Sequence, residues 1–239
     1  MSIYSASALH SSRSLWQETI IELRRAGAFS PALSRRPAHD PNQTFSSSVK
    51  SALSALDTFS HVLKGIDRLT HDHSERVARR AIRLARLVGV SCEEMKCLQL
   101  GALLHDCGKI DISPTTLNKP SALTDDEYSE IKQHPLHGVR ILRSVPALQA
   151  AIPTVLHHHE RFDGTGYPAR LNGEEIPLTA RIVCIVDSYD AMISERPYRR
   201  ALSPQHAQET LCACSGSQFD PELVDAFVSD LKTTPRDSF

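Results

Sequence analysis

Three adjacent histidines, a glutamate and a glycine-rich turn follow one another in residues 157–168, which read HHHERFDGTGYP. Neutral imidazole is the commonest metal ligand in proteins, and a histidine-rich tract usually binds metal. Adjacent residues on a helix point about 100° apart, so two neighbouring histidines can lie on two sides of one site. The Asp-Gly and Gly-Tyr-Pro steps are typical of a rigid turn. We therefore expect a ligand cluster with a loop as one wall of its pocket; three surface histidines before a loop are the alternative.

Two further sets of polar residues interrupt segments that otherwise look like a helical core. His105-Asp106 closes an apolar run at 98–104, and Asp187 directly follows the apolar residues 182–186. A buried carboxylate without a partner is costly, and a hydrogen bond, a pKa shift or a metal is the usual remedy. Taken singly, such an aspartate is often the partner of a helix cap. Their combination with several histidines favours a metal site.

The candidate ligands are nitrogen and oxygen donors without a thiolate, which suits Mn, Fe, Co, Ni or Zn rather than a structural zinc site. The set is too large for one four-coordinate ion. It suits two metals about 3.5–4 Å apart that share a carboxylate, the arrangement used to hydrolyse phosphate esters. The candidates are His73, expected just before a helix, His134, expected at the end of one, His158 and His159, expected at the end of another, together with His105, Asp106 and Asp187.

The elements that must position these residues are predicted to be helices throughout, so the expected fold class is all-α. Capping boxes at Ser91/Glu94 and Thr124/Glu127 indicate two helix starts, and Gly89 indicates a helix end. Residues 182–193 are apolar on nearly every side, which predicts a central buried helix. The other expected helices are 49–63, 77–88, a segment from 91 to at least 104, one ending near His134, 148–159, and a short last helix that starts at Asp220-Pro221.

Size and composition indicate one globular domain with a short extension. The chain has 239 residues, a formal net charge of -1 and 41% hydrophobic residues, which gives no reason to expect a DNA or membrane partner. No run is long enough to span a membrane and no signal-peptide region is evident, so the cytoplasm is the expected location. The six cysteines form no disulfide framework. Residues 1–50 are expected to be a helical and linker extension, partly disordered, and residues 51–239 the domain.

Beyond these single features, the residues resemble a known family. His105-Asp106 is similar to the defining doublet of the HD superfamily of metal-dependent phosphohydrolases. The segment 158–168 resembles the signature of its HD-GYP subfamily without a gap. Further similar segments are His73-Ser74-Glu75-Arg76-Val77, Gly108-Lys109, Asn118-Lys119-Pro120, His134-Pro135 with Gly138, Asp187 with Tyr189-Asp190, Arg196-Pro197-Tyr198-Arg199, and Gln218-Phe219-Asp220-Pro221. The resemblance covers about residues 60–230.

The resemblance implies an HD-type helical bundle that hydrolyses cyclic di-GMP to linear pGpG, in some members further to GMP. It implies a two-metal centre, most readily of Fe or Mn, with Ni, Co or Zn as alternatives, in which a metal-bridging hydroxide attacks phosphorus. The implied metal ligands are His73, His105, Asp106, His134, His158, His159 and Asp187, with Asp106 as the bridging carboxylate.

Other residues take roles from the same resemblance. Lys109 would approach the scissile phosphate, unless it is a solvated helix-end charge, and Asp67 would lie near the metal-bound water. Arg196 and Arg199 match the region that holds substrate phosphate or guanine, with a structural ion pair as the alternative. Gly166 and Tyr167 would shape the pocket or a surface for a protein partner, and Glu160 could orient an imidazole from outside the ligand set.

The sequence departs from the family pattern at two positions, Leu69 and Cys107, and it leaves more than one function open. Some relatives bind a third metal through a glutamate where this chain has Leu69, so we expect two metals, with pGpG as the product and its further hydrolysis to GMP as an open alternative. Cys107 follows the His-Asp doublet, where buried packing is the expected role and redox sensitivity the alternative. An active phosphodiesterase is the main hypothesis. The alternatives are a weakly active sensor or interaction module that uses the loop 163–168, and an enzyme for another cyclic dinucleotide or for pGpG.

Overall fold

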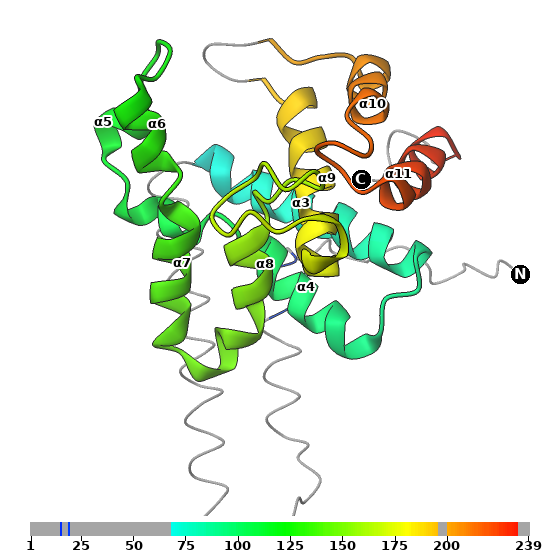
Figure 1. Ribbon diagram of the computed structural model, residues 1–239, viewed down its shortest axis with the longest axis horizontal. Coiled ribbons are helices and arrows are strands. Elements are labelled where there is room, and N and C mark those ends of the chain that lie inside the picture. Colours follow the sequence, from blue (N-terminus) through cyan, green and yellow to red (C-terminus); the bar gives the residue numbers. More distant parts are fainter. Residues whose placement is uncertain (1–14, 16–18, 20–67, 196–199, 234–239) are drawn as a thin grey trace, which may run out of the picture.

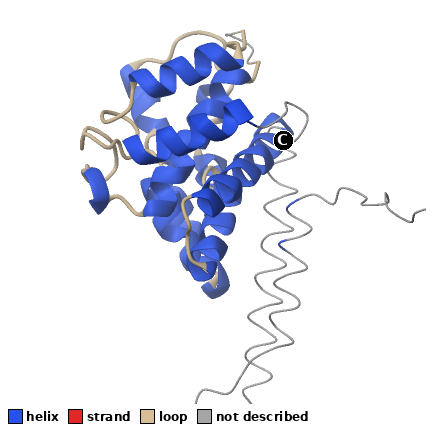
Figure 2. Ribbon diagram, turned by 90° about the vertical axis from the view of Figure 1, so that its right-hand side faces the viewer, coloured by secondary structure: helices blue, strands red, loops and turns tan. Residues whose placement is uncertain are grey.

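The computed structural model describes residues 15, 19, 68–195 and 200–233 of the chain. Within these residues all regular structure is helical, apart from one isolated β-bridge between Ser215 and Phe219. The prediction of an all-α fold is therefore confirmed (Figure 2). The helix expected at 49–63 and the extension expected at 1–50 lie outside the described residues, except for Leu15 and Thr19, which are both buried in helical segments.

Helix α9 (Leu178–Ile193) is the central element of the described bundle (Figure 1). It packs against five helices because its side chains are apolar on most sides, and Ile182, Ile185 and Val186 are fully buried. The prediction of a central buried helix at 182–193 is correct. The helices packed around it are α3 (Arg68–Leu87), α4 (Cys92–Leu104), α8 (Ile152–His157), α10 (Pro204–Ala213) and α11 (Pro221–Thr233).

Local cap chemistry sets several of the helix ends as predicted. The Ser91 hydroxyl accepts from the Glu94 backbone N–H at the start of α4, and the Glu94 side chain reciprocates. Thr124 forms the same box at the start of α6 (Asp125–Ile131). Beyond the end of α3, Gly89 has φ +74°, a left-handed conformation that glycine adopts without strain. These short-range signals were readable because cap and capped residue lie within four positions of each other.

Three predicted boundaries near the histidines are wrong. His134 begins α7 (His134–Arg143) rather than ending a helix, because Pro135 sits in the first turn, where no N–H is needed. His73 lies within α3 rather than before it. The helix expected at 148–159 is a 3₁₀ helix, η2 (Pro146–Ala151), followed by α8, and His158 and His159 lie in the turn beyond its end.

A close backbone approach brings the His-Asp doublet next to α7. Gly108 lies in η1 (Cys107–Asp111), the 3₁₀ helix after α4. A Cβ atom at Gly108 would lie 2.0 Å from the His134 carbonyl oxygen and 2.4 Å from the Gly138 backbone nitrogen. Only a residue without a side chain allows this packing. The approach places Asp106 and Lys109, on either side of Gly108, beside His134.

Helices α5 (Pro114–Leu117) and α6 form a small lobe, residues 112–133, between η1 and α7. The Glu130 carboxylate joins the two helices, because it accepts from the Ser113 backbone N–H at 2.8 Å and from the Thr116 hydroxyl at 2.7 Å. In Figure 1 this lobe projects on one side of the loop that follows α8, and α10 lies on the other side. The loop leads to the short 3₁₀ helix η3 (Gly173–Glu175) and then to α9.

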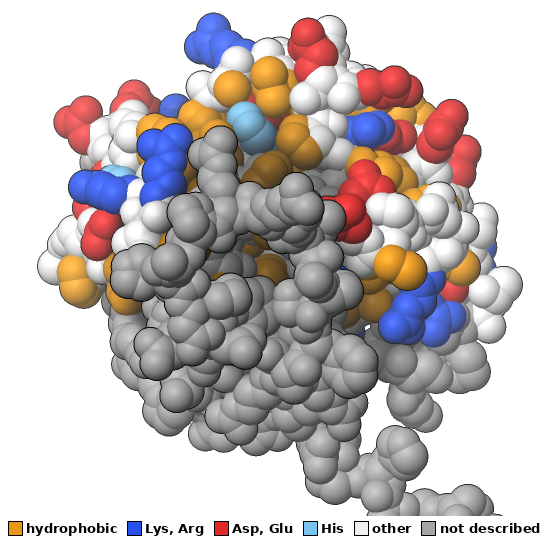
Figure 3. Space-filling model, turned by 90° about the horizontal axis from the view of Figure 1, so that it is seen from below, with side chains coloured by type: hydrophobic (Ala, Val, Ile, Leu, Met, Phe, Trp, Pro, Cys, Tyr) orange, Lys and Arg blue, Asp and Glu red, His pale blue; other side chains and the backbone are white. Residues whose placement is uncertain are grey.

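The described surface carries mixed charge. Figure 3 shows acidic and basic side chains interspersed over the part of that face that is not grey, in agreement with the formal net charge of -1. Among the helices in the described ranges, none combines the length and the hydropathy that crossing a bilayer requires.

Candidate metal centre

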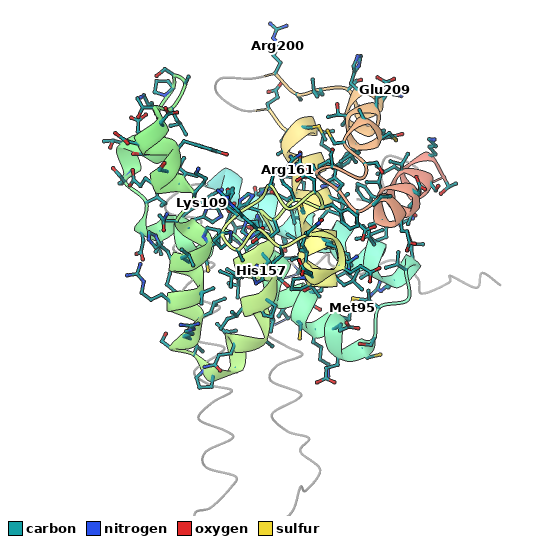
Figure 4. All side chains as sticks on the ribbon, in the orientation of Figure 1. Met95, Lys109, His157, Arg161, Arg200 and Glu209 are labelled. Atoms are coloured by element: carbon teal, nitrogen blue, oxygen red, sulfur yellow. The ribbon has the colours of Figure 1, made fainter. Side chains whose placement is uncertain are left out.

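The seven predicted ligands converge from five segments of the bundle into one buried cluster. The cluster contains two groups, and within each group the candidate ligand atoms all lie within 4.8 Å of one another. The first group is His134, His158 and His159, and the second is His73, His105 and Asp187. Lys109, labelled near the middle of Figure 4, lies beside them.

Asp106 lies between the two groups. One carboxylate oxygen, Oδ2, is 3.4 Å from His105 Nε2 in the second group. The other, Oδ1, is 3.5 Å from His134 Nε2 in the first group. Because each oxygen faces a different group, the Asp106 carboxylate has the position that a bridging ligand requires.

Three of the imidazoles are oriented by carbonyls of their own chain segment. His105 Nδ1 donates to Ala102 O at 2.8 Å, and His134 Nδ1 donates to Ile131 O at 2.8 Å. In the same way, His158 Nδ1 donates to Val155 O at 2.9 Å. Each carbonyl lies three residues before its histidine. Since a carbonyl can only accept, Nδ1 carries a proton in each of the three rings, and Nε2 faces the centre.

The orientation of His73 depends instead on a carboxylate that the sequence interpretation did not assign. Its Nδ1 pairs with Asp190 Oδ2 at 2.7 Å, while its Nε2 pairs with Asp187 Oδ1 at 2.9 Å. Asp190 is fully buried and also accepts from Arg76 through both oxygens at 2.9 Å, and from Arg80. One signal for Asp190 was available: it follows Asp187 by three residues on the same apolar helix, hence on the same side.

Burial and charge divide the histidines into two kinds. Burial lowers the pKa of His134 to about 3 and that of His159 to about 4, and it lowers the pKa of His158 as well. These imidazoles are therefore neutral at pH 7. Burial acts in the same direction on His73, but its hydrogen bonds with Asp187 and Asp190 outweigh it and raise the pKa to about 9.

The donors fit divalent cations. His105 Nε2 is fully buried and has no hydrogen-bond partner among the described residues, which is costly unless a ligand occupies that position. Burial disfavours ionisation of Asp106, yet Lys109 and His105 hold its pKa well below the usual range, so that it carries a negative charge. Imidazole nitrogens together with negatively charged carboxylates are a ligand set that suits Mn, Fe, Co, Ni or Zn.

Cys107 lies in the core beside the doublet. Burial raises the pKa of its thiol to about 12, and the neighbouring Asp106 carboxylate acts in the same direction. Because the thiolate is the reactive form, this environment favours a packing role over redox sensitivity.

The remaining expected residues have varied surroundings. Lys109 Nζ is 2.6 Å from Asp106 Oδ2, and its side chain keeps 29% of its surface exposed. The Tyr167 ring stacks on the His159 ring with centroids 4.9 Å apart. A Cβ atom at Gly166 would lie 2.3 Å from the Arg161 backbone nitrogen, so the loop packs closely there. Asp67, Arg196 and Arg199 lie outside the described residues.

Glu160 is buried, and its carboxylate contacts Ala169 and His157 rather than the seven candidate ligands. Its Oε1 accepts from the Ala169 backbone N–H at 2.6 Å and lies 3.5 Å from His157 Nδ1. The Glu160 carboxylate thus connects the segment before the loop 163–168 with the residue after it. The imidazole that lies nearest to this carboxylate is that of His157, which is not one of the seven candidate ligands.

Comparison with known proteins gives one family and several relatives. A model of the HD domain family matches residues 57–223 of the chain. A cyclic di-GMP phosphodiesterase of Thermotoga maritima is 42% identical over 164 residues, which are 68% of this chain and 45% of that protein. The 3'3'-cGAMP-specific phosphodiesterase 2 of Vibrio cholerae is 39% identical over 160 residues, which are 66% of this chain and 31% of that protein.

A solved structure supports the fold. The protein Bd1817 of Bdellovibrio bacteriovorus, described as an HDG"Y"P protein, superposes with a TM-score of 0.60 at 17% identity, over 95% of this chain and 75% of that one. The chain spans less than half the length of the two curated relatives given above.

Proposed function

This chain belongs to the HD domain family, and on that premise we propose that it is a phosphodiesterase that hydrolyses cyclic di-GMP to linear pGpG at a two-metal centre. The observation that carries the proposal is the arrangement of two ligand groups on either side of one shared carboxylate, Asp106, with the Lys109 ammonium beside it. The names of two relatives, for cyclic di-GMP and for 3'3'-cGAMP, support a cyclic dinucleotide as the substrate class.

The chemistry assigns roles to the residues of this chain. Divalent cations held by the seven candidate ligands would supply Lewis-acid stabilisation of negative charge and a water of lowered pKa. The partly exposed Lys109 ammonium binds a non-bridging oxygen of the scissile phosphate and balances the charge that develops there. Hydrolysis breaks the bond between phosphorus and the 3' oxygen of one ribose, and water supplies the new phosphate oxygen. Asp67 is proposed to orient that water.

Substrate recognition is proposed to involve two arginines and the tyrosine of the loop 163–168. Arg196 and Arg199 hold a phosphate or a guanine, for which the planar guanidinium is suited. Tyr167, fixed against His159, forms a wall of the pocket. We expect two metals rather than three because Leu69 offers no ligand atom.

An anaerobic assay of cyclic di-GMP and 3'3'-cGAMP hydrolysis, with metals counted on the same sample, tests this proposal. Production of pGpG by protein that contains about two metals per chain supports it. Faster turnover of 3'3'-cGAMP would change the substrate but keep the reaction. Tight binding of cyclic di-GMP without turnover in Fe- or Mn-loaded protein would contradict an enzyme and favour a sensor or an interaction module that uses the loop 163–168.

Metal removal is expected to destabilise the fold as well as stop hydrolysis. A cation that binds only the native state at a concentration 100 times its Kd stabilises by about 2.7 kcal/mol, which corresponds to about 5–10 °C in Tm for a domain of this size. Differential scanning calorimetry before and after chelation, and after adding Mn back, measures the change. The variant H105A/D106A serves as the control, because chelation should leave its Tm unchanged. An equal shift in both proteins would contradict a stabilising cation at this centre.

A further inference from the structure

Tyr128 is a large aromatic residue that remains half exposed on its lobe. Helix α6 has no buried residue, and half of the Tyr128 surface, 50%, is exposed. The contacts with α5 and its flanks come from Glu127, which pairs with Lys119 at 2.6 Å, and from Glu130. Successive helix residues are 100° apart, so Tyr128 points away from the side that these two glutamates share.

The position of Tyr128 is close to the metal centre. It lies one helical turn before Ile131, whose carbonyl accepts the hydrogen bond from His134 Nδ1. It also interacts electrostatically with Tyr167: burial raises the pKa of the Tyr167 phenol, and the Tyr128 phenol raises it further. Tyr167 in turn stacks on His159. Tyr128 therefore lies one helical turn from the carbonyl that orients His134, at the end of the lobe that adjoins the centre.

A cation accompanies the exposed ring. The Lys132 ammonium lies over the Tyr128 ring, 4.8 Å from its centroid, and the two residues share a helix face at a spacing of four. An aromatic ring with an adjacent ammonium matches the chemistry of a purine base. The ring offers a stacking surface, and the ammonium is a donor for the O6 and N7 acceptors of guanine.

We propose that Tyr128 and Lys132 form a stacking platform for one purine base of the cyclic dinucleotide, while the scissile phosphate lies at Asp106 and Lys109. This inference rests on the proposed function, since it assigns part of its substrate. It makes the α5–α6 lobe a determinant of substrate specificity, because the lobe carries the platform and is joined to the centre at both ends, through η1 and His134.

Kinetics with two diesters test the platform. The substrates are cyclic di-GMP and methyl p-nitrophenyl phosphate, which has no purine. For Tyr128→Ala, kcat/KM for cyclic di-GMP is expected to fall about 5- to 150-fold, mostly through KM, since stacking of one base is worth about 1–3 kcal/mol. The value for methyl p-nitrophenyl phosphate should change less than about twofold. Tyr128→Phe keeps the ring and should retain activity, and Leu136→Ala, at another exposed apolar residue, is the control.

Three outcomes would overturn the inference. Unchanged kinetics of Tyr128→Ala with cyclic di-GMP would show that no base stacks there. An equal loss with both diesters would show that Tyr128 supports His134 or the lobe rather than the base. A wild-type protein that cleaves the simple diester but no cyclic dinucleotide would overturn the proposed function itself. This result is distinct from the first two, in which the wild type hydrolyses cyclic di-GMP.

Discussion

The double substitution His105→Ala/Asp106→Ala is expected to abolish hydrolysis of cyclic di-GMP and to remove most of the bound metal. The physical reason is the position of Asp106, with its two oxygens at 3.4 Å from His105 Nε2 and 3.5 Å from His134 Nε2. Its loss removes a carboxylate that faces both groups and leaves Lys109 without that partner. We expect kcat to fall at least about 10³-fold, which corresponds to about 4 kcal/mol of transition-state stabilisation.

Metal analysis, circular dichroism and steady-state kinetics on one preparation measure this effect. The matched control is Asp111→Ala, because Asp111 lies in the same 3₁₀ helix as Lys109 and pairs only loosely with the exposed Arg140 at 3.7 Å. It should retain both metal and activity. A folded double variant that retains full activity would contradict the two-metal mechanism.

Replacement of Asp190 by asparagine is expected to weaken metal binding and to destabilise the fold together. Asp190 orients His73 and accepts from Arg76 and Arg80 in a buried environment. Loss of its charge removes the buried carboxylate that three cationic groups share, and breaking a buried ion pair typically costs about 3–5 kcal/mol. Loss of a partner that orients a metal-ligating imidazole typically lowers metal affinity about 10- to 100-fold. Competition with a chelator of known affinity, and urea unfolding of the metal-free protein, measure the two effects.

Asp230→Asn is the matched control for this prediction. Asp230 is another buried aspartate that pairs with an arginine of α3, Arg83, at 2.5 Å, but it lies on α11 rather than on α9. It should destabilise the protein while metal affinity remains unchanged. If both variants lower metal affinity equally, the effect of Asp190 is a general loss of structure, and its assigned role with His73 is wrong.

The sequence predicted those features whose cause is local. The two capping boxes, the Gly89 helix end and the buried helix around residues 182–193 depend on residues a few positions apart, and all are present. The chemistry of the centre was also readable, because imidazoles and carboxylates inside apolar runs are costly without partners. The convergence of all seven candidate residues in one cluster follows that reading.

The features that the sequence did not reveal depend on tertiary packing. Pro135 is compatible with a helix that ends before it and with one that begins at His134, and only the contact of Gly108 with α7 distinguishes the two. The role of Asp190 could not be predicted, because it depends on α3 packing against α9 so that His73 lies beside Asp190. Tyr128 looks like an ordinary surface residue in the sequence, and its electrostatic interaction with Tyr167 arises from how the lobe is joined to the bundle.

The pairing of His73 with Asp190 has a consequence for the biosynthesis of the protein. The two residues are 117 positions apart, and they belong to the first and the central helix described above. At about 5–20 residues per second, a ribosome needs on the order of ten seconds to travel between them. Near the end of that interval the nascent chain contains His134, His158 and His159 but still lacks both aspartates of α9. The half of the centre around His73 therefore arises last, and a product truncated before α9 retains at most the three-imidazole half.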